Sequence, residues 1–151
     1  MGFSDAVRSC MREKYFRFSG RAARSEFWWF TLFMWLVMLV AGAALGGLFF
    51  GVASNSFGNG VGIVGWLLII IGAVVFVALQ LPAIAVTVRR FHDKNLSGWW
   101  VLAVIVLSNV PFLGILVNIA SLVILVMKGT EGDNRFGPDP LRVQNSAEVF
   151  A

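Results

Sequence analysis

The stretch that decides the fold runs Val88-Arg-Arg-Phe-His-Asp-Lys-Asn-Leu-Ser-Gly-Trp-Trp100. It contains the only histidine of the chain and three of its 12 basic residues, and it separates two uncharged hydrophobic runs, 61–88 and 99–127. About 20 apolar residues suffice to cross the roughly 30 Å of hydrocarbon in a bilayer. A compact charged segment between two such runs must lie at a membrane surface. Its side of the membrane then sets the topology of the whole chain.

The overall composition excludes a water-soluble globule. The 151 residues are 58% hydrophobic and only 13% charged, with a mean hydropathy of +0.81, whereas a soluble domain carries about 25% charged residues. We therefore expect an all-α polytopic membrane protein, with one membrane domain over residues 1–140 and a flexible tail over 141–151. Residues 1–26 contain charged residues throughout and are too long a segment for a signal-peptide n-region, so we expect the first span to be an uncleaved targeting signal.

The net charge of +4 does not indicate a nucleic-acid partner. The basic residues cluster beside the hydrophobic runs, and in a membrane protein this pattern reports orientation and contact with anionic phospholipid. The single cysteine, Cys10, excludes an intrachain disulfide and makes a cysteine-based metal site within the chain an unfavourable interpretation.

The first part of the chain predicts a surface helix followed by a transmembrane helix. Residues 3–18 place apolar side chains three and four positions apart, which is typical of an amphipathic helix in the headgroup layer. The alternative is a solvated helix packed on the protein's own loops. Span one is expected over 27–51, and within it Gly42 and Gly46 form a small-residue pattern for helix packing, which we expect to act inside this chain.

Span two is expected over 61–88 and is longer than the bilayer is thick. Its 28 residues would measure roughly 42 Å, so it must tilt, kink or protrude. Pro82 supplies a kink and frees the carbonyl of Ala78. We expect the amide of Gln80 to satisfy that carbonyl or to bond to a neighbouring helix.

The third hydrophobic region, 99–127, is interrupted by Asn109-Val-Pro-Phe-Leu-Gly114. It could be one long kinked helix. Alternatively, two half-length helices could form a hairpin, which would give four membrane segments, and Asn109, Pro111 and Gly114 favour this turn. Against the hairpin, no charge marks a turn that reaches the opposite membrane surface.

The distribution of basic residues predicts the topology. Residues 1–26 carry six Lys or Arg, 52–60 carry none and the loop expected at 89–98 carries three. The positive-inside rule therefore places the N-terminus and this loop in the cytoplasm. The tail, 128–151, carries three Lys or Arg and four Asp or Glu and indicates a side only weakly. We expect it in the cytoplasm, and hence a hairpin in the third region.

Three separated motifs resemble a known family. They are Phe-Ser-Gly-Arg-Ala-Ala-Arg-Ser-Glu-Phe-Trp before span one, Arg-Arg-Phe-His-Asp-Lys-Asn-Leu-Ser-Gly-Trp-Trp after span two, and Asn-Arg-Phe-Gly-Pro-Asp-Pro after the third region. Together they resemble the bacterial inner-membrane family catalogued as domain of unknown function 805, over about residues 12 to 140. The resemblance implies a small multi-pass protein of the bacterial inner membrane and supplies no activity, substrate or catalytic residue. Phe91 stands where that family is expected to have leucine.

With this topology the three motifs meet in one charged layer, and two interpretations of it stay open. The charges could form an ion-pair network that ties the helix ends together. Alternatively, surplus arginines could bind anionic lipid headgroups or a small anionic ligand. Arg89 and Arg90 are adjacent on a helix, so we expect them to serve different partners. The candidate cluster comprises Arg21, Arg24, Glu26, Arg89, Arg90, His92, Asp93 and Arg135.

The motifs do not favour catalysis. His92 and Asp93 point in different directions on a helix, the spacing of a metal site is missing, and so are nucleotide-binding and hydrolase loops. We therefore expect no catalytic residue, cofactor or metal. The spans contain no ionisable residue of the kind that pumps use. We expect a non-catalytic accessory or scaffold subunit that packs against another membrane protein or its own copies. The alternative is an oligomeric transporter or sensor of a small molecule or lipid.

Overall fold

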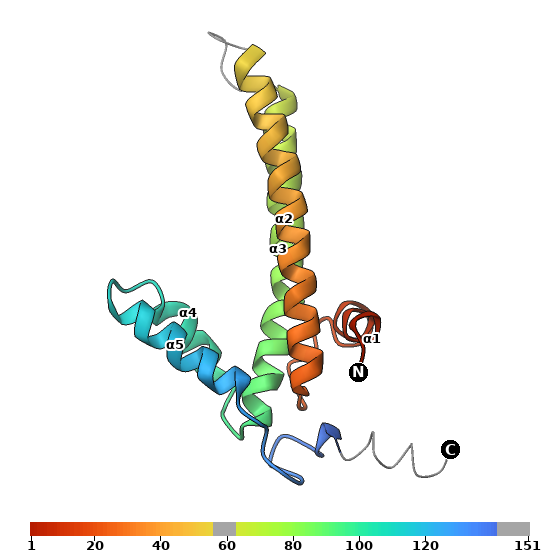
Figure 1. The fold of residues 1–151 in the computed structure, drawn as a ribbon, viewed down its shortest axis with the longest axis vertical. Helices are drawn as coiled ribbons and strands as arrows, with labels where there is room; N and C mark the ends of the chain where they lie inside the picture. Colours follow the sequence, from red (N-terminus) through yellow and green to blue (C-terminus); the bar gives the residue numbers. More distant parts are fainter. Residues whose placement is uncertain (56–62, 142–151) are drawn as a thin grey trace.

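The computed structural model describes residues 1–55 and 63–141, and helices dominate this part of the chain (Figure 1). α1 (Phe3–Arg8) continues into a π-helical turn, η1 (Ser9–Glu13), and two long helices follow, α2 (Arg24–Asn55) and α3 (Ile63–Asp93). Two shorter helices, α4 (Trp99–Leu107) and α5 (Leu113–Val126), complete the order. The predicted all-α class is confirmed.

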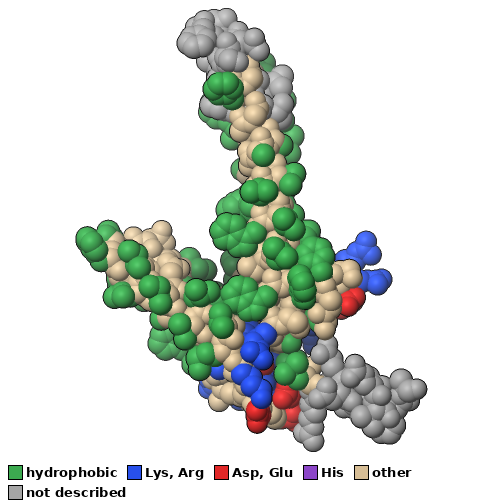
Figure 2. Space-filling view, viewed as in Figure 1, with side chains coloured by type: hydrophobic (Ala, Val, Ile, Leu, Met, Phe, Trp, Pro, Cys, Tyr) green, Lys and Arg blue, Asp and Glu red, His purple; other side chains and the backbone are tan. Residues whose placement is uncertain are grey.

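The long helices expose their apolar side chains. Arg24–Gly47 of α2 and Gly65–Asp93 of α3 are long and apolar enough to cross a membrane, and only 11% of the most apolar window of each is buried. A core helix of a soluble protein would be mostly buried, so lipid must cover these surfaces. Figure 2 shows hydrophobic side chains over the long pair and the shorter arm, with charged side chains gathered at one end. The chain is a polytopic integral membrane protein.

The close approach of α2 to α3 occurs at a different glycine from the one expected. A Cβ atom at Gly72 would lie 2.9 Å from the side chain of Leu45, so glycine, which has no side chain, fits this close contact. Gly42 and Gly46 are exposed, and a Cβ there would meet nothing within 4 Å in the described part of the chain. Among the described residues, the structure therefore brings no other helix against either glycine, and their role in helix packing stays a prediction.

The carbonyl freed by Pro82 has a partner, although not the expected one. Pro82 is buried inside α3, which continues through it. The Tyr15 hydroxyl donates a hydrogen bond to the Ala78 carbonyl, one turn earlier. Gln80 therefore does not perform this role. The prediction that Pro82 frees a carbonyl needing a donor is confirmed, and the assignment of the donor is corrected.

The third hydrophobic region is a hairpin, as the turn residues predicted. Asn109 Nδ2 donates to the Ile105 carbonyl at 2.7 Å at the end of α4, and Phe112 has a positive φ of 62°. A Cβ at Gly114 would lie 2.3 Å from the Ser108 carbonyl oxygen, so only glycine fits where the chain turns back from α4 into α5. α4 has 9 residues and α5 has 14, or about 14 and 21 Å, so each segment is shorter than a full span.

The N-terminal helix ends earlier than predicted and packs on the long helices. The turn Ser9–Glu13 closes with a 2.8 Å bond from the Lys14 N–H to the Ser9 carbonyl, so the helix does not reach residue 18. Ala6 and Cys10 are buried, and the Phe3 ring meets the Trp29 ring edge-on at 5.9 Å. The inward face of this helix is therefore covered by the protein itself.

The segment predicted as a loop over 89–98 is helical in its first half. α3 continues to Asp93 and ends in a Schellman arrangement, with bonds from Leu96 N to Phe91 O at 3.0 Å and from Asn95 N to His92 O at 2.9 Å. Asn95 has φ of 58°, which suits this cap. The helix continues because its charged side chains find partners in the fold. The predictions for residues 61–62 and 142–151 lie outside the described part of the chain.

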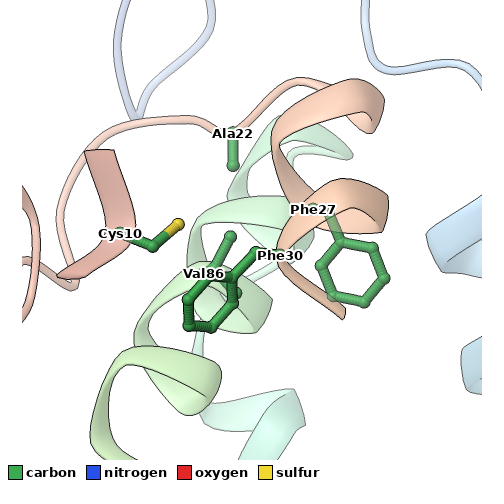
Figure 3. Packing of buried hydrophobic residues seen from close by; sticks show 5 residues of the cluster. All are labelled: Cys10, Ala22, Phe27, Phe30 and Val86. Carbon is green, nitrogen blue, oxygen red and sulfur yellow. The ribbon is translucent and has the colours of Figure 1, made fainter. Parts of the chain in front are cut away.

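The buried apolar core lies at one end of the bundle. Figure 3 shows the side chains of Cys10, Ala22, Phe27, Phe30 and Val86 packed together where the N-terminal segment meets α2 and α3. A second cluster joins α3 to the α4–α5 hairpin and consists of Val88, Phe91 and Val101. Both clusters adjoin the charged side chains described next, so the core holds those charges in place.

Candidate functional site

Charged side chains converge where α2 begins and α3 ends, and this region is named the charged end (Figure 2). Four polar side chains are buried within the last turn of α3, and Arg21, just before α2, and Glu26, in the first turn of α2, are buried beside them. The predicted convergence of the first two motifs is therefore present. The α3 side chains concerned are Arg89, Arg90, His92 and Asp93.

Glu26 is the centre of the first ion-pair group. Its Oε1 accepts hydrogen bonds from Arg89 Nη2 at 3.2 Å, Lys14 Nζ at 3.2 Å and Ser9 Oγ at 3.4 Å. Its side chain is only 4% exposed. A carboxylate buried to this degree needs such partners, so Glu26 ties the N-terminal segment and α3 to the first turn of α2.

Arg89 also holds the chain between the N-terminal helix and α2. Its Nη1 donates to the carbonyls of Lys14 at 3.2 Å and Arg17 at 2.8 Å. The Ala22 N–H donates to the Arg89 carbonyl at 3.1 Å. The planar guanidinium can serve a carboxylate and two carbonyls at once because its donors form a fixed fork.

Asp93 is the centre of the second ion-pair group and faces two arginines. Arg21 Nε donates to Oδ1 at 2.9 Å, and Arg90 Nη1 donates to Oδ2. Arg90 Nε also donates to the Leu125 carbonyl at 3.1 Å, and its Nη2 donates to the Met127 carbonyl. Arg90 thus caps the last carbonyls of α5, which would otherwise lack donors. The prediction that Arg89 and Arg90 serve different partners is confirmed.

Residues 127–140, named the strap, cross the end of α3. Thr130 donates from its N–H at 2.9 Å and its hydroxyl at 3.0 Å to the Asp93 carbonyl, and Asn134 Nδ2 donates to the His92 carbonyl at 3.0 Å. Arg21 donates to two strap carbonyls, those of Thr130 and Gly132, at 2.5 Å each. The strap thereby supplies hydrogen-bond donors to the last backbone carbonyls of α3.

His92 joins the strap through its ring. Its Nδ1 lies 3.1 Å from the Gly20 carbonyl oxygen, so Nδ1 carries the hydrogen. The His92 ring stacks on Phe136 with 3.9 Å between centroids and 4° between planes. The Arg135 guanidinium lies 4.7 Å from the Phe136 ring centroid and donates to the Asn95 carbonyl at 2.8 Å. The third motif is thus brought to the first two.

Arg24 differs from the other members of the cluster. It is exposed, and within residues 1–55 and 63–141 it makes no hydrogen bond or ion pair. The remaining seven predicted residues all have partners in the fold. Sequence reasoning missed three important partners, Lys14, Thr130 and Phe136, because they reach the charged end from distant segments.

The chemistry available at the charged end is ionic and not nucleophilic. Burial, followed by the nearby charge of Glu26, raises the pKa of the Cys10 thiol to about 12, so this thiol stays protonated at neutral pH. Across the described part of the chain, no three His, Cys, Asp or Glu side chains are placed to hold a metal ion together. The arrangement joins helix ends and, among the arginines of the predicted cluster, leaves Arg24 alone without a partner within the described residues.

Comparisons with known proteins agree with this architecture. The inner membrane protein YhaI of Escherichia coli strain K12 is 36% identical over 128 residues, which cover 85% of this chain and 89% of that protein. The inner membrane protein YhaH of the same strain is 39% identical over 128 residues, which cover 85% of this chain and 90% of that protein. The uncharacterized protein YiiR of that strain is 28% identical over 151 aligned positions, 88% of this chain and 92% of that protein.

No solved structure matches the chain. The family model described as "Protein of unknown function (DUF805)" matches residues 15–138, a range that contains most of the charged end, both long helices and the hairpin. The three motifs that resembled this family lie on the three segments that the charged end brings together. The chain therefore belongs to the DUF805 family.

Proposed function

We propose that this protein is a non-catalytic accessory or scaffold subunit of the bacterial inner membrane. It packs against another membrane protein inside the bilayer, and its charged end faces the cytoplasm and contacts anionic lipid. The inner-membrane assignment is supported by the names of the relatives YhaI and YhaH. Packing is supported by one observation above all, an unpaired amide in a groove.

The groove lies between the α2–α3 pair and the α4–α5 arm, where Figure 2 shows a hollow. Two cavities of about 410 and 390 Å³ flank the same ridge of α3, on which Gln80, Ala83 and Thr87 follow at helical spacing. One cavity is completed by α2 side chains such as Met34, the other by hairpin side chains such as Val104.

Gln80 has no hydrogen-bond partner in the described part of the chain. The amide lies in the membrane segment of α3, where water cannot replace a missing partner, and an unsatisfied amide in hydrocarbon costs several kcal/mol by order of magnitude. A polar side chain of another helix satisfies such an amide and fixes the register of the contact. The groove therefore suits a helix supplied from outside this chain.

The orientation follows from the basic residues. The charged end gathers the N-terminal segment, the end of α3 and the strap, and the positive-inside rule favours the cytoplasmic side for such a cluster. There the exposed arginines, Arg8, Arg12, Arg17 and Arg24, meet the anionic leaflet surface. A reporter fused after Ala151 that is active only outside the cytoplasm would contradict this orientation.

The packing proposal is tested by site-specific photo-crosslinking in intact cells. A photoreactive residue replaces Gln80 in the groove, and the matched control replaces Val77, which is 61% exposed on the same helix and does not line the groove. The proposal expects a discrete crosslinked protein from position 80 and none from position 77. Mass spectrometry then identifies another membrane protein or a second copy. Equal, diffuse labelling from both positions would refute the packing function.

The second candidate is an oligomeric transporter or sensor of a small molecule or lipid. The two cavities beside Gln80 favour it, because each is large enough for a small ligand. It requires several copies, since the single chain encloses little volume. Proteoliposomes that leak no faster than empty vesicles would eliminate transport and leave the accessory role standing.

A further inference from the structure

A separate cavity lies at the charged end, outside the membrane groove. It has a volume of about 280 Å³ and is lined from three directions, by the start of α2, the end of α3 and the strap. Arg24 and Ser25 border it from α2, Arg90 from α3, and Lys128 and Asp139 from the strap. Arg21, Arg90 and Asp93 of the second ion-pair group also line this cavity.

The charges around this cavity do not balance. Four cationic side chains and three carboxylates line it, which leaves one positive charge in excess. Arg21 and Arg90 already share the single carboxylate of Asp93. Lys128 pairs with Glu131 at 2.6 Å in an exposed ion pair, and Asp139 accepts from the N–H groups of Gly132 and Leu141.

Arg24 carries the excess charge. It has no hydrogen bond or ion pair within the described residues, although it borders the same cavity as the buried Arg90. An arginine fork with free donors is suited to a tetrahedral oxyanion, which it binds through two parallel N–H···O bonds. Lys128 can add a point charge on the other side, because exposed ion pairs such as its pair with Glu131 are weak and exchange readily.

The position of the cavity also suits a phosphate group from the bilayer. Arg24 and Trp28 are four residues apart on α2 and so lie on the same face of the helix. Trp28 is 37% exposed, and tryptophan marks the water–lipid boundary of a membrane helix. A phosphate bound at Arg24 would therefore lie at headgroup depth.

We propose that this cavity binds one phosphate group, with Arg24 and Lys128 as its cationic ligands. The group is either the phosphodiester of an anionic lipid headgroup or a soluble phosphate, which present the same oxygens to the site. The inference rests on the proposed lipid-facing orientation of the charged end. It assigns the lipid contact to one defined cavity in place of a diffuse basic surface.

The test uses the full chain purified in gentle detergent and mixed with phosphatidylglycerol and phosphatidylethanolamine at equal concentrations. Native mass spectrometry measures how much of each lipid stays bound. The key variant is Arg24→Gln, and the matched control is Arg12→Gln, because both remove one exposed arginine from the same end of the molecule. Arg24 bonds to nothing in the described chain, so Arg24→Gln keeps the fold, which circular dichroism verifies.

The proposal expects Arg24→Gln to reduce phosphatidylglycerol retention about tenfold or more, the loss expected for a charged hydrogen-bonding pair. Arg12→Gln should stay within about twofold, since a distant exposed charge is screened. Lys128→Gln should have an intermediate effect. Inorganic phosphate that displaces the lipid at millimolar concentration indicates a site for soluble phosphates, whereas lipid retention that phosphate does not affect indicates a headgroup site.

Equal losses in Arg24→Gln and Arg12→Gln would overturn the built site and leave the diffuse lipid contact of the proposed function intact. Equal retention of both lipids by the unaltered protein, with no displacement by phosphate, would overturn the site and the lipid contact together. The crosslinking result at Gln80 is independent of either outcome.

Discussion

Replacing Arg89 by alanine is expected to be among the most damaging single changes at the charged end. The side chains of Arg89 and Glu26 are 1% and 4% exposed and lie 3.2 Å apart. Breaking a buried ion pair by removing one partner costs about 3–5 kcal/mol, because the other charge stays buried. Lys14 remains beside Glu26 but is 26% exposed, so it compensates only partly. We expect Arg89→Ala to lower the free energy of unfolding by about 3 kcal/mol.

The assay is reversible unfolding in mixed micelles, followed by circular dichroism as the fraction of denaturing detergent rises. The matched control is Arg12→Ala, which removes an exposed arginine with no bond in the described chain. Its free energy of unfolding should change by no more than about 0.5 kcal/mol. The comparison separates the loss of the buried pair from the loss of one positive charge.

The double variant Arg89→Met with Glu26→Leu tests the reason for the loss. Removing both charges leaves no buried carboxylate without a partner, so this protein should be more stable than Arg89→Ala despite carrying two changes. A loss below about 1 kcal/mol for Arg89→Ala, the range of a surface pair, would refute the reasoning. A double variant whose loss of unfolding free energy equals the sum of the losses from the two single substitutions would refute it as well.

Two further predictions concern the N-terminal segment that precedes α2. Tyr15→Phe should lower the unfolding free energy by about 1–3 kcal/mol, because the Ala78 carbonyl loses its donor. The same change should cost less in a Pro82→Ala background, because residue 82 then has an N–H that can bond to this carbonyl. An equal cost in both backgrounds would contradict the assignment. Cys10 should react with maleimide at pH 8 roughly 1000-fold more slowly than a thiol of ordinary pKa, because only the thiolate reacts and the Cys10 pKa is raised to about 12. Its rate should rise about tenfold per pH unit up to that pKa, and rapid labelling at pH 8 in the folded protein would refute the burial.

The parts of the fold that could be predicted from the sequence depend on local chemistry. Asn109, Pro111 and Gly114 favour a turn through their own backbone preferences, and the hairpin follows from them. The divergence of Arg89 and Arg90 follows from helix geometry alone. The loss of a helical hydrogen bond at Pro82 is equally local, and the structure has a donor at the carbonyl where one was needed.

The identity of distant partners could not be predicted in the same way. Tyr15 reaches the Ala78 carbonyl across 63 positions of sequence, and Arg21 reaches the Gly132 carbonyl across 111. No periodicity encodes such pairs, because they depend on how the helices cross. Gly42 and Gly46 illustrate a related limit: a small-residue pattern shows that a close approach is possible, but not which helix makes it or on which side.

The charged end also joins the α4–α5 arm to the long helices, through the bonds of Arg90. Lipid tails are as apolar as the helix surfaces, so no hydrophobic force inside the bilayer draws the α4–α5 arm onto the long pair. Figure 1 shows this arm joining the pair near the end of α3 and diverging from it beyond that point. At the junction, Arg90 binds the carbonyls of Leu125 and Met127 as well as Asp93. A lysine there could not reach all three groups with one ammonium. The buried charges therefore set how the α4–α5 arm leaves the end of α3, and with it the space in front of the α3 face on which Gln80 lies.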